Sequence, residues 1–294
     1  MKNPFQGLIC PILTPFDSNG GINFQVLQQL IDSLILKGVP CLMTGGTTGE
    51  GMLLTTEERM QLSEAVVMHI SGRAKVIVHT GSITTKETLT LTRHAQEIGA
   101  DGISAITPYF FSYSDEEIYR YYEAIAKSVP DMPVSLYCFP GNAKHDIKTS
   151  LLTRIIIDMP NVKALKSSNP DLIRFAEYVN SVPQGVSILC GVDALTLPAL
   201  TLGSRGQVSG NSNVFPEPFL QLFNAYQSGN NAEASKHQTE INHIRGILKD
   251  SIAYFKAAAD ILGIPVGDPR LPMQPLNSVE KMKLKSDLQG LNLL

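Results

Sequence analysis

The chain alternates short apolar runs with amphipathic segments from its N-terminus to about residue 228. Short apolar runs bounded by turn residues are typical of buried strands, and apolar positions three or four residues apart are typical of helices that pack one face on a sheet. Strands are predicted over residues 7–14, 40–43, 75–80, 102–107, 134–138, 161–168, 186–190 and 206–209. Helices are predicted over residues 24–37, 85–98, 114–128, 149–158, 170–180 and 194–202, with two more beginning at Thr55 and after Pro216.

Eight strands that alternate with eight helices, without a long linker, predict a (β/α)8 TIM barrel of the α/β class. An open doubly wound sheet is the alternative, and the even spacing of the repeats favours closure. The strand pattern ends near residue 229. Beyond it the sequence predicts helices over 231–262, broken near Asp250, and over 278–288. We therefore expect a catalytic barrel, residues 1–228, and a helical extension, residues 229–294, packed on it.

Composition narrows the function classes. The 294 residues are 43% hydrophobic and 17% charged with a net charge of −3, which is globular composition without a basic footprint for nucleic acid or a membrane surface. No signal peptide or membrane-spanning run is predicted.

Cys10, Cys41, Cys138 and Cys190 form no C-x-x-C pair, so we expect buried, reduced thiols in a cytoplasmic protein. The six histidines lack metal-site spacing, and no metal site is expected.

One lysine stands out in the predicted strand 161–168, which reads N-V-K-A-L-K-S-S. Alternation places Val162, Ala164 and Lys166 on one face of this strand. Burial costs an ammonium its hydration and favours the neutral amine, which is the form that attacks a ketone. The alternative is that Lys166 only ends the strand and extends to water.

In a barrel of this kind, catalytic groups gather at the C-terminal ends of the strands. The loop G-G-T-T-G-E, residues 45–50, follows the second strand there, and Thr47 and Thr48 offer hydroxyl and N–H groups to a carboxylate. The loop lacks the lysine of a phosphate-binding loop, and a simple tight turn is the alternative. Tyr137 ends the fifth strand beside that of Lys166, where a phenol can move protons, or can be an ordinary core tyrosine.

Two further segments lie at the ends of strands seven and eight. The first, G-V-D, runs from Gly191 to Asp193, and the second, G-Q-V-S-G-N-S-N, covers residues 206–213. Their small and polar side chains suit a wall that contacts a ligand. Alternatively, Asp193 caps the helix after strand seven.

Taken together, the motifs resemble the family of pyruvate-dependent class I aldolases, which includes dihydrodipicolinate synthase, N-acetylneuraminate lyase and 2-keto-3-deoxy-sugar-acid aldolases. The resemblance covers most of the chain and rests on the motifs L-T-P-F (13–16), G-T-T-G-E (46–50), T-P-Y (107–109), Y-x-x-P (137–140), A-L-K-S-S (164–168), G-V-D (191–193) and S-x-x-x-N (209–213).

The resemblance implies roles for individual residues. Lys166 would form a Schiff base with pyruvate or another 2-keto acid, and Tyr137 would give and take protons. Thr47 and Thr48 would hold the carboxylate, with Thr47 also in the proton relay, and Val208 would contact the keto acid through its backbone. Because the imine supplies the electron sink, no cofactor is expected. The family also implies a homo-oligomer, a dimer or a homotetramer.

Three positions depart from the named specialists of the family. Where dihydrodipicolinate synthases carry an arginine for the second substrate's carboxylate, this chain has Asn142; where they take a relay tyrosine from a neighbouring subunit, it has Phe110. Sialic acid lyases have a glutamate after the aspartate, where Ala194 stands here. Gly191, Asp193 and Asn142 remain candidate substrate contacts.

These departures favour a lyase that reversibly cleaves a 2-keto-3-deoxy or 4-hydroxy-2-keto acid to pyruvate and an aldehyde. The alternatives are dihydrodipicolinate synthase, which condenses pyruvate with aspartate semialdehyde, a sugar-acid dehydratase that uses the same imine, and a non-catalytic keto-acid-binding protein.

Overall fold

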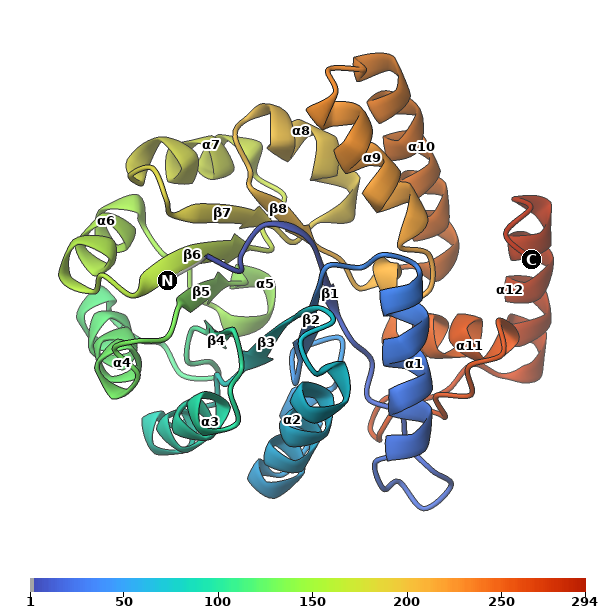
Figure 1. The fold of residues 1–294 in the computed structure, drawn as a ribbon, viewed down its shortest axis with the longest axis horizontal. Helices are drawn as coiled ribbons and strands as arrows, with labels where there is room; N and C mark the ends of the chain where they lie inside the picture. Colours follow the sequence, from blue (N-terminus) through green and yellow to red (C-terminus); the bar gives the residue numbers. More distant parts are fainter. Residues whose placement is uncertain (1–2) are drawn as a thin grey trace.

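The computed structural model describes residues 3–294 and shows eight parallel strands closed into a barrel with helices around it (Figure 1). Each strand pairs with its neighbours in chain order, and β1 closes the ring by pairing with β8. The strands are β1 (Gly7–Pro11), β2 (Cys41–Thr44), β3 (Lys75–His79), β4 (Gly102–Ile106), β5 (Val134–Cys138), β6 (Val162–Ser167), β7 (Ser187–Cys190) and β8 (Gly206–Val208). The predicted (β/α)8 barrel is confirmed, and the open sheet is excluded.

The helices follow the predicted order with local differences. They are α1 (Phe24–Leu36), α2 (Thr56–Ile70), α3 (Thr85–Glu97), α4 (Asp115–Ser128), α5 (Pro140–Ala143), α6 (Thr149–Asp158), α7 (Leu172–Ser181), α8 (Thr196–Thr201), α9 (Glu217–Gln227), α10 (Asn231–Leu248), α11 (Ile252–Ile261) and α12 (Ser278–Gly290). Three short 3-10 turns add η1 (Gly51–Leu53), η2 (Asp193–Leu195) and η3 (Asn211–Asn213). The short helix α5 was not predicted, and the predicted helix at 194 begins as the turn η2.

Local sequence explains where several helices begin. The hydroxyls of Thr55 and Ser114 accept hydrogen bonds from the backbone N–H groups of Glu58 and Glu117, whose carboxylates accept in return from the capping residues. Each capping box satisfies N–H groups that the first helical turn leaves without partners. Acidic residues in the same turns also complement the helix dipole.

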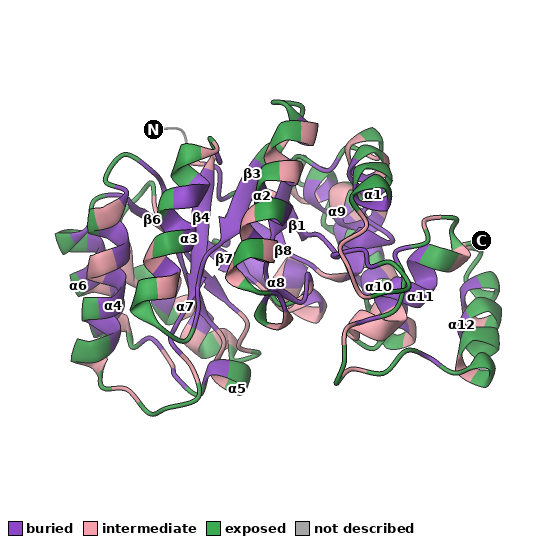
Figure 2. Ribbon diagram, turned by 90° about the horizontal axis from the view of Figure 1, so that it is seen from below, coloured by how far each residue is buried: buried purple, intermediate pink, exposed green. Residues whose placement is uncertain are grey.

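Apolar residues form two layers. Inside the barrel lies a small cluster of Phe5, Ile9, Cys41, Met43, Ile77, Ala164, Leu189 and Val208. A larger cluster fills the space between the strands and the inner faces of the helices, and Figure 2 shows burial along the strands with exposure on the outer helix faces. All four cysteines are buried and form no disulfide, as predicted.

Strand β6 corrects one detail of the prediction. Ala164 packs inside the barrel and Leu165 outside it, as alternation predicts, but Val162 packs in the outer cluster. The register with β5 shifts at this point: Val134 pairs with Val162, while the next residue, Ser135, pairs with Ala164. A bulge with one extra residue reverses the alternation locally. Lys166 lies beyond the bulge and keeps its inward orientation.

The C-terminal part is helical, with the predicted break near Asp250 between α10 and α11. Helix α10 packs against α9, and α12 lies at the outer edge of the molecule beside α11 (Figure 1). The division into a barrel of residues 1–228 and an extension of residues 229–294 stays a prediction. Among residues 3–294, the structure contains no helix with the length and apolar character to span a membrane.

Candidate active site

Tyr137 and Lys166 lie side by side at the C-terminal ends of adjacent strands. They are directly paired in the register of β5 and β6. Both side chains are buried, and Lys166 Nζ lies 3.9 Å from the centroid of the Tyr137 ring. The amine of Lys166 and the phenol of Tyr137 therefore lie together, as the predicted positions on neighbouring strand ends require.

A cavity of about 360 Å³ opens at this end of the barrel. Most of the residues predicted for the site line it, namely Thr47, Thr48, Tyr137, Lys166, Gly191, Asp193 and Val208. Asn142 is not part of this lining. It lies on α5, and its side chain is exposed. This position argues against its predicted contact with substrate, which stays a prediction.

The loop that carries Thr47 and Thr48 is tightly folded. A Cβ atom on Gly51 would lie 1.9 Å from the carbonyl oxygen of Gly45, so the turn requires glycine there. The hydroxyl of Thr14 donates to the carbonyl of Gly49 over 2.6 Å and fixes the loop to the segment that follows β1. Thr48 is half-buried and Thr47 exposed, and both lie at the cavity.

Gly191 makes room for the lysine. A Cβ atom at this position would lie 3.0 Å from Lys166 Cε and 2.2 Å from Ser168 Oγ. A larger residue would therefore clash with the Ser168 hydroxyl and press against the aliphatic chain that carries the amine. Packing around Lys166 thus accounts for the glycine, and the predicted contact of Gly191 with substrate stays a prediction.

Asp193 is buried in a network of neutral donors. Its Oδ1 accepts from Gln207 Nε2 over 2.7 Å, and its Oδ2 accepts from Ser209 Oγ and Asn211 Nδ2 over 2.6 Å each. Burial raises the pKa of this carboxyl to about 6, against the opposing effect of the three hydrogen bonds. The carboxylate caps no helix, because its hydrogen bonds run to side chains of residues 207–211, in β8 and the segment after it; the helix-cap alternative is wrong.

His79 belongs to the cavity wall, and the sequence interpretation missed it. Its ring meets the Tyr137 ring edge-on, with centroids 6.1 Å apart. His79 Nε2 accepts from the Ile106 N–H over 3.3 Å. Burial, followed by the positive charges of Arg59 and Lys166, holds its pKa well below the usual value. A neutral imidazole thus backs the phenol. Its place at the end of predicted strand three was the available signal.

Three other lining residues come from the C-terminal helices: Arg245 near the end of α10, Asp250 in the break, and Phe255 on α11. Arg245 Nε lies 2.7 Å from Asp250 Oδ2. Nothing local in the sequence marks these residues, because only the packing of α10 and α11 brings them to the strand ends.

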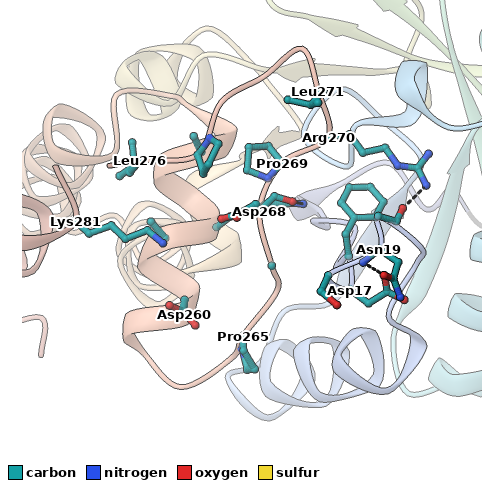
Figure 3. Close-up of a pocket in the computed structure, with 18 residues that line it drawn as sticks. Asp17, Asn19, Asp260, Pro265, Asp268, Pro269, Arg270, Leu271, Leu276 and Lys281 are labelled. Atoms are coloured by element: carbon teal, nitrogen blue, oxygen red, sulfur yellow. Dashed lines mark hydrogen bonds between the residues drawn. The ribbon is translucent and has the colours of Figure 1, made fainter. Parts of the chain in front are cut away.

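A larger cavity of about 840 Å³ lies elsewhere, between α11, the segment 263–277 and the turn at Asp17–Gly20 (Figure 3). Its polar side chains include Asp17, Asp260 and Asp268. The amine at its edge, Lys256, is paired with Glu50 over 2.6 Å and is not free to react. Size alone does not identify the reactive site, and the smaller cavity is the candidate.

Comparison with known proteins agrees with this geometry. Residues 4–291 match the model of the dihydrodipicolinate synthetase family. The chain belongs to this family. The prediction of a carbon–carbon lyase of the dihydrodipicolinate synthase family is confirmed, and membership favours an enzyme over the non-catalytic binding protein.

Within the dihydrodipicolinate synthetase family, the chain is 36% identical to a 4-hydroxy-tetrahydrodipicolinate synthase of Bacillus subtilis (strain 168), over 98% of this chain and 99% of that protein. A prophage protein of E. coli K12, solved in complex with pyruvate and described as a member of the dihydrodipicolinic acid synthase family, superposes with a TM-score of 0.95 at 30% identity, over 99% and 100% of the two chains. The sialic acid aldolase of Ruminococcus gnavus superposes with a TM-score of 0.93 at 26% identity, over 98% and 97%.

Proposed function

We propose that Lys166 forms a Schiff base with pyruvate or a related 2-keto acid, and that the enzyme makes or breaks a carbon–carbon bond to an aldehyde. The observation that carries this proposal is the buried Lys166 amine, 3.9 Å from the Tyr137 ring in a cavity at the strand ends. The similarity to an E. coli protein solved with pyruvate supports the choice of keto acid.

The residues divide the chemistry between them. Thr47 and Thr48 bind the carboxylate of the keto acid, and the neutral amine of Lys166 adds to its ketone carbon. Tyr137 carries the protons as the carbinolamine loses water. In cleavage, the protonated imine accepts the electron pair of the C3–C4 bond as the C4 hydroxyl loses its proton, and the resulting enamine takes up a proton at C3. In synthesis, the imine loses a C3 proton to give the enamine, which attacks the aldehyde, and the alkoxide that forms takes up a proton. Hydrolysis of the imine releases the product and returns the free amine.

The first candidate for the aldehyde is aspartate semialdehyde. The B. subtilis relative at 36% identity is named a 4-hydroxy-tetrahydrodipicolinate synthase, and so is one from Methanococcus aeolicus at 32%. A condensation of pyruvate with aspartate semialdehyde is the reaction that this naming supports, in place of the sugar-acid cleavage that the departures favoured.

Reversible cleavage of a 2-keto-3-deoxy or 4-hydroxy-2-keto acid is the second candidate, and two positions favour it. Asn142 is exposed and carries no charge for a carboxylate. Phe110, which stands where the synthases have a relay tyrosine, is 77% exposed and has no proton to transfer. A homotetramer with Phe110 near a subunit interface, and a cytoplasmic location, stay predictions.

Borohydride reduction in the presence of pyruvate tests the proposal. We expect an adduct in the intact mass that maps to the peptide containing Lys166. An unmodified protein, or an adduct on another lysine, would overturn the mechanism. Steady-state rates with aspartate semialdehyde and with a panel of hydroxyaldehydes then separate the two candidates. A product that retains every carbon of a sugar acid would indicate dehydration instead.

A further inference from the structure

Arg245 gives the candidate cavity a second basic side chain besides Lys166. The charged side chains that line this cavity are Lys166, Arg245, Asp193 and Asp250. In the proposed function, Lys166 is committed to the keto acid. Asp193 is committed to Gln207, Ser209 and Asn211 by hydrogen bonds of 2.6 to 2.7 Å. The Arg245–Asp250 pair is therefore the charged group at this cavity that has no assigned task.

The ion pair between Arg245 and Asp250 leaves the terminal nitrogens of Arg245 free to bind another group. Asp250 Oδ1 accepts from Asn211 Nδ2 over 3.0 Å, and Asp250 Oδ2 lies 2.7 Å from Arg245 Nε. Both carboxylate oxygens thus already have a partner. The two terminal nitrogens of Arg245 have no hydrogen-bond or ion-pair partner among residues 3–294. A guanidinium held at Nε presents its other edge as a two-pronged donor, which fits a carboxylate.

The backbone holds this pair in an unusual way. Lys249 and Asp250, directly after α10, have φ angles of +55° and +49°. Two consecutive non-glycine residues in the left-handed region carry a conformational cost. This reversal returns the chain from α10 to α11 and places Asp250 beside Asn211 at the cavity.

We propose that Arg245 is the specificity-determining residue for the aldehyde substrate and binds a carboxylate at the end of that aldehyde remote from the reacting carbon. Asp250 positions the guanidinium through Nε. This inference rests on the proposed function and adds the substrate class: an aldehyde that carries a distal carboxylate. Arg245, on α10, would also supply the positive charge that the synthases carry at the position of Asn142.

Two aldehydes that differ in the distal carboxylate test the proposal: succinic semialdehyde and butanal. Their condensation with pyruvate is measured for the wild type, Arg245→Gln, Arg245→Lys and a control, Arg73→Gln. Arg73 is a matched control because it is paired with Asp32 over 2.8 Å and is 43% exposed, against 42% for Arg245, and it precedes β3 at the opposite end of the barrel. Pyruvate trapping by borohydride on the wild type comes first, so that failure of the Schiff-base proposal is recognised separately.

We expect the wild type to prefer succinic semialdehyde over butanal in kcat/KM by at least about tenfold. Arg245→Gln should lower that ratio about 10- to 100-fold, mainly through the KM for the aldehyde, because a charge-assisted hydrogen bond is lost. Arg245→Lys should restore part of it, and Arg73→Gln should keep the wild-type ratio. A wild type without the preference, including one that uses neither aldehyde, overturns the proposal. So does an Arg245→Gln variant that retains the preference.

Discussion

Two buried lysines in this chain have opposite surroundings. Lys256 on α11 is 2% exposed, and its Nζ lies 2.6 Å from Glu50 Oε1 and 3.1 Å from the carbonyl oxygen of Asp268. Lys166 at the end of β6 is 7% exposed, and no carboxylate among residues 3–294 forms an ion pair with it. Instead, Lys166 Nζ lies over the face of the Tyr137 ring, 3.9 Å from the ring centroid.

The difference separates a structural lysine from a reactive one. A buried ammonium is costly unless a carboxylate and hydrogen bonds offset its lost hydration. Lys256 has these partners, and it ties α11 to Glu50, the last residue of the loop that carries Thr47 and Thr48. Lys166 lacks them and opens into the cavity, so its amine remains available to a keto acid.

Replacement of Lys166 is expected to have the largest effect. Lys166→Met should remove the nucleophile and lower kcat on the order of 10⁴-fold or more. It should also leave the free energy of unfolding unchanged within about 1 kcal/mol, or raise it, because no buried partner loses its counterion. Steady-state rates and urea unfolding measure the two effects. A large loss of stability would show that Lys166 is structural, like Lys256.

Replacement of Tyr137 tests whether its hydroxyl transfers protons or its ring only packs beside Lys166. Tyr137→Phe removes the hydroxyl and keeps the ring that stacks on Phe139 at 6.0 Å. We expect a loss of about 10²- to 10⁴-fold in kcat, the usual contribution of proton transfer. Pyruvate should still be trapped on Lys166, at a lower rate. An unchanged kcat would reduce Tyr137 to a packing role.

Replacement of Lys256 should act through stability. Lys256→Met leaves the carboxylate of Glu50 buried without its cation, and we expect a loss of about 3–5 kcal/mol in the free energy of unfolding. The double variant Lys256→Met, Glu50→Gln is the control, and it should recover part of that loss because no charge is then buried alone. Urea unfolding of both variants checks this. A single variant as stable as the wild type contradicts the structural assignment.

The sequence predicted what local pattern determines. Alternating apolar runs specify strands, and the barrel rule places Tyr137, Lys166, Thr47 and Thr48 at one end. The bulge in β6 was not predictable, because both faces of this strand are buried and an apolar Val162 is compatible with either face. Arg245 and Asp250 were not predictable either, since tertiary packing of α10 and α11 brings them to the cavity.

The two buried carboxyls Glu50 and Asp193 also differ in whether a cation lies beside them. Glu50 is held by a cation, whereas Asp193 is held by the neutral donors Gln207, Ser209 and Asn211. Burial raises the pKa of Asp193 to about 6, above its value of about 3.9 in an unfolded chain. The folded state therefore holds this proton more tightly than the unfolded state does.

The smallest predicted effect is a pH dependence that follows from this shift. The contribution of Asp193 to stability is fully present below about pH 4 and falls as the pH rises to about 6, with a total loss of about 3 kcal/mol. The unfolding free energy of the wild type minus that of Asp193→Asn should therefore decrease between pH 4 and pH 7 in urea titrations. The exposed Asp131→Asn is the control and should show no such trend. A difference between wild type and Asp193→Asn that stays constant with pH would mean that the neutral donors stabilise the Asp193 carboxylate as fully as water does.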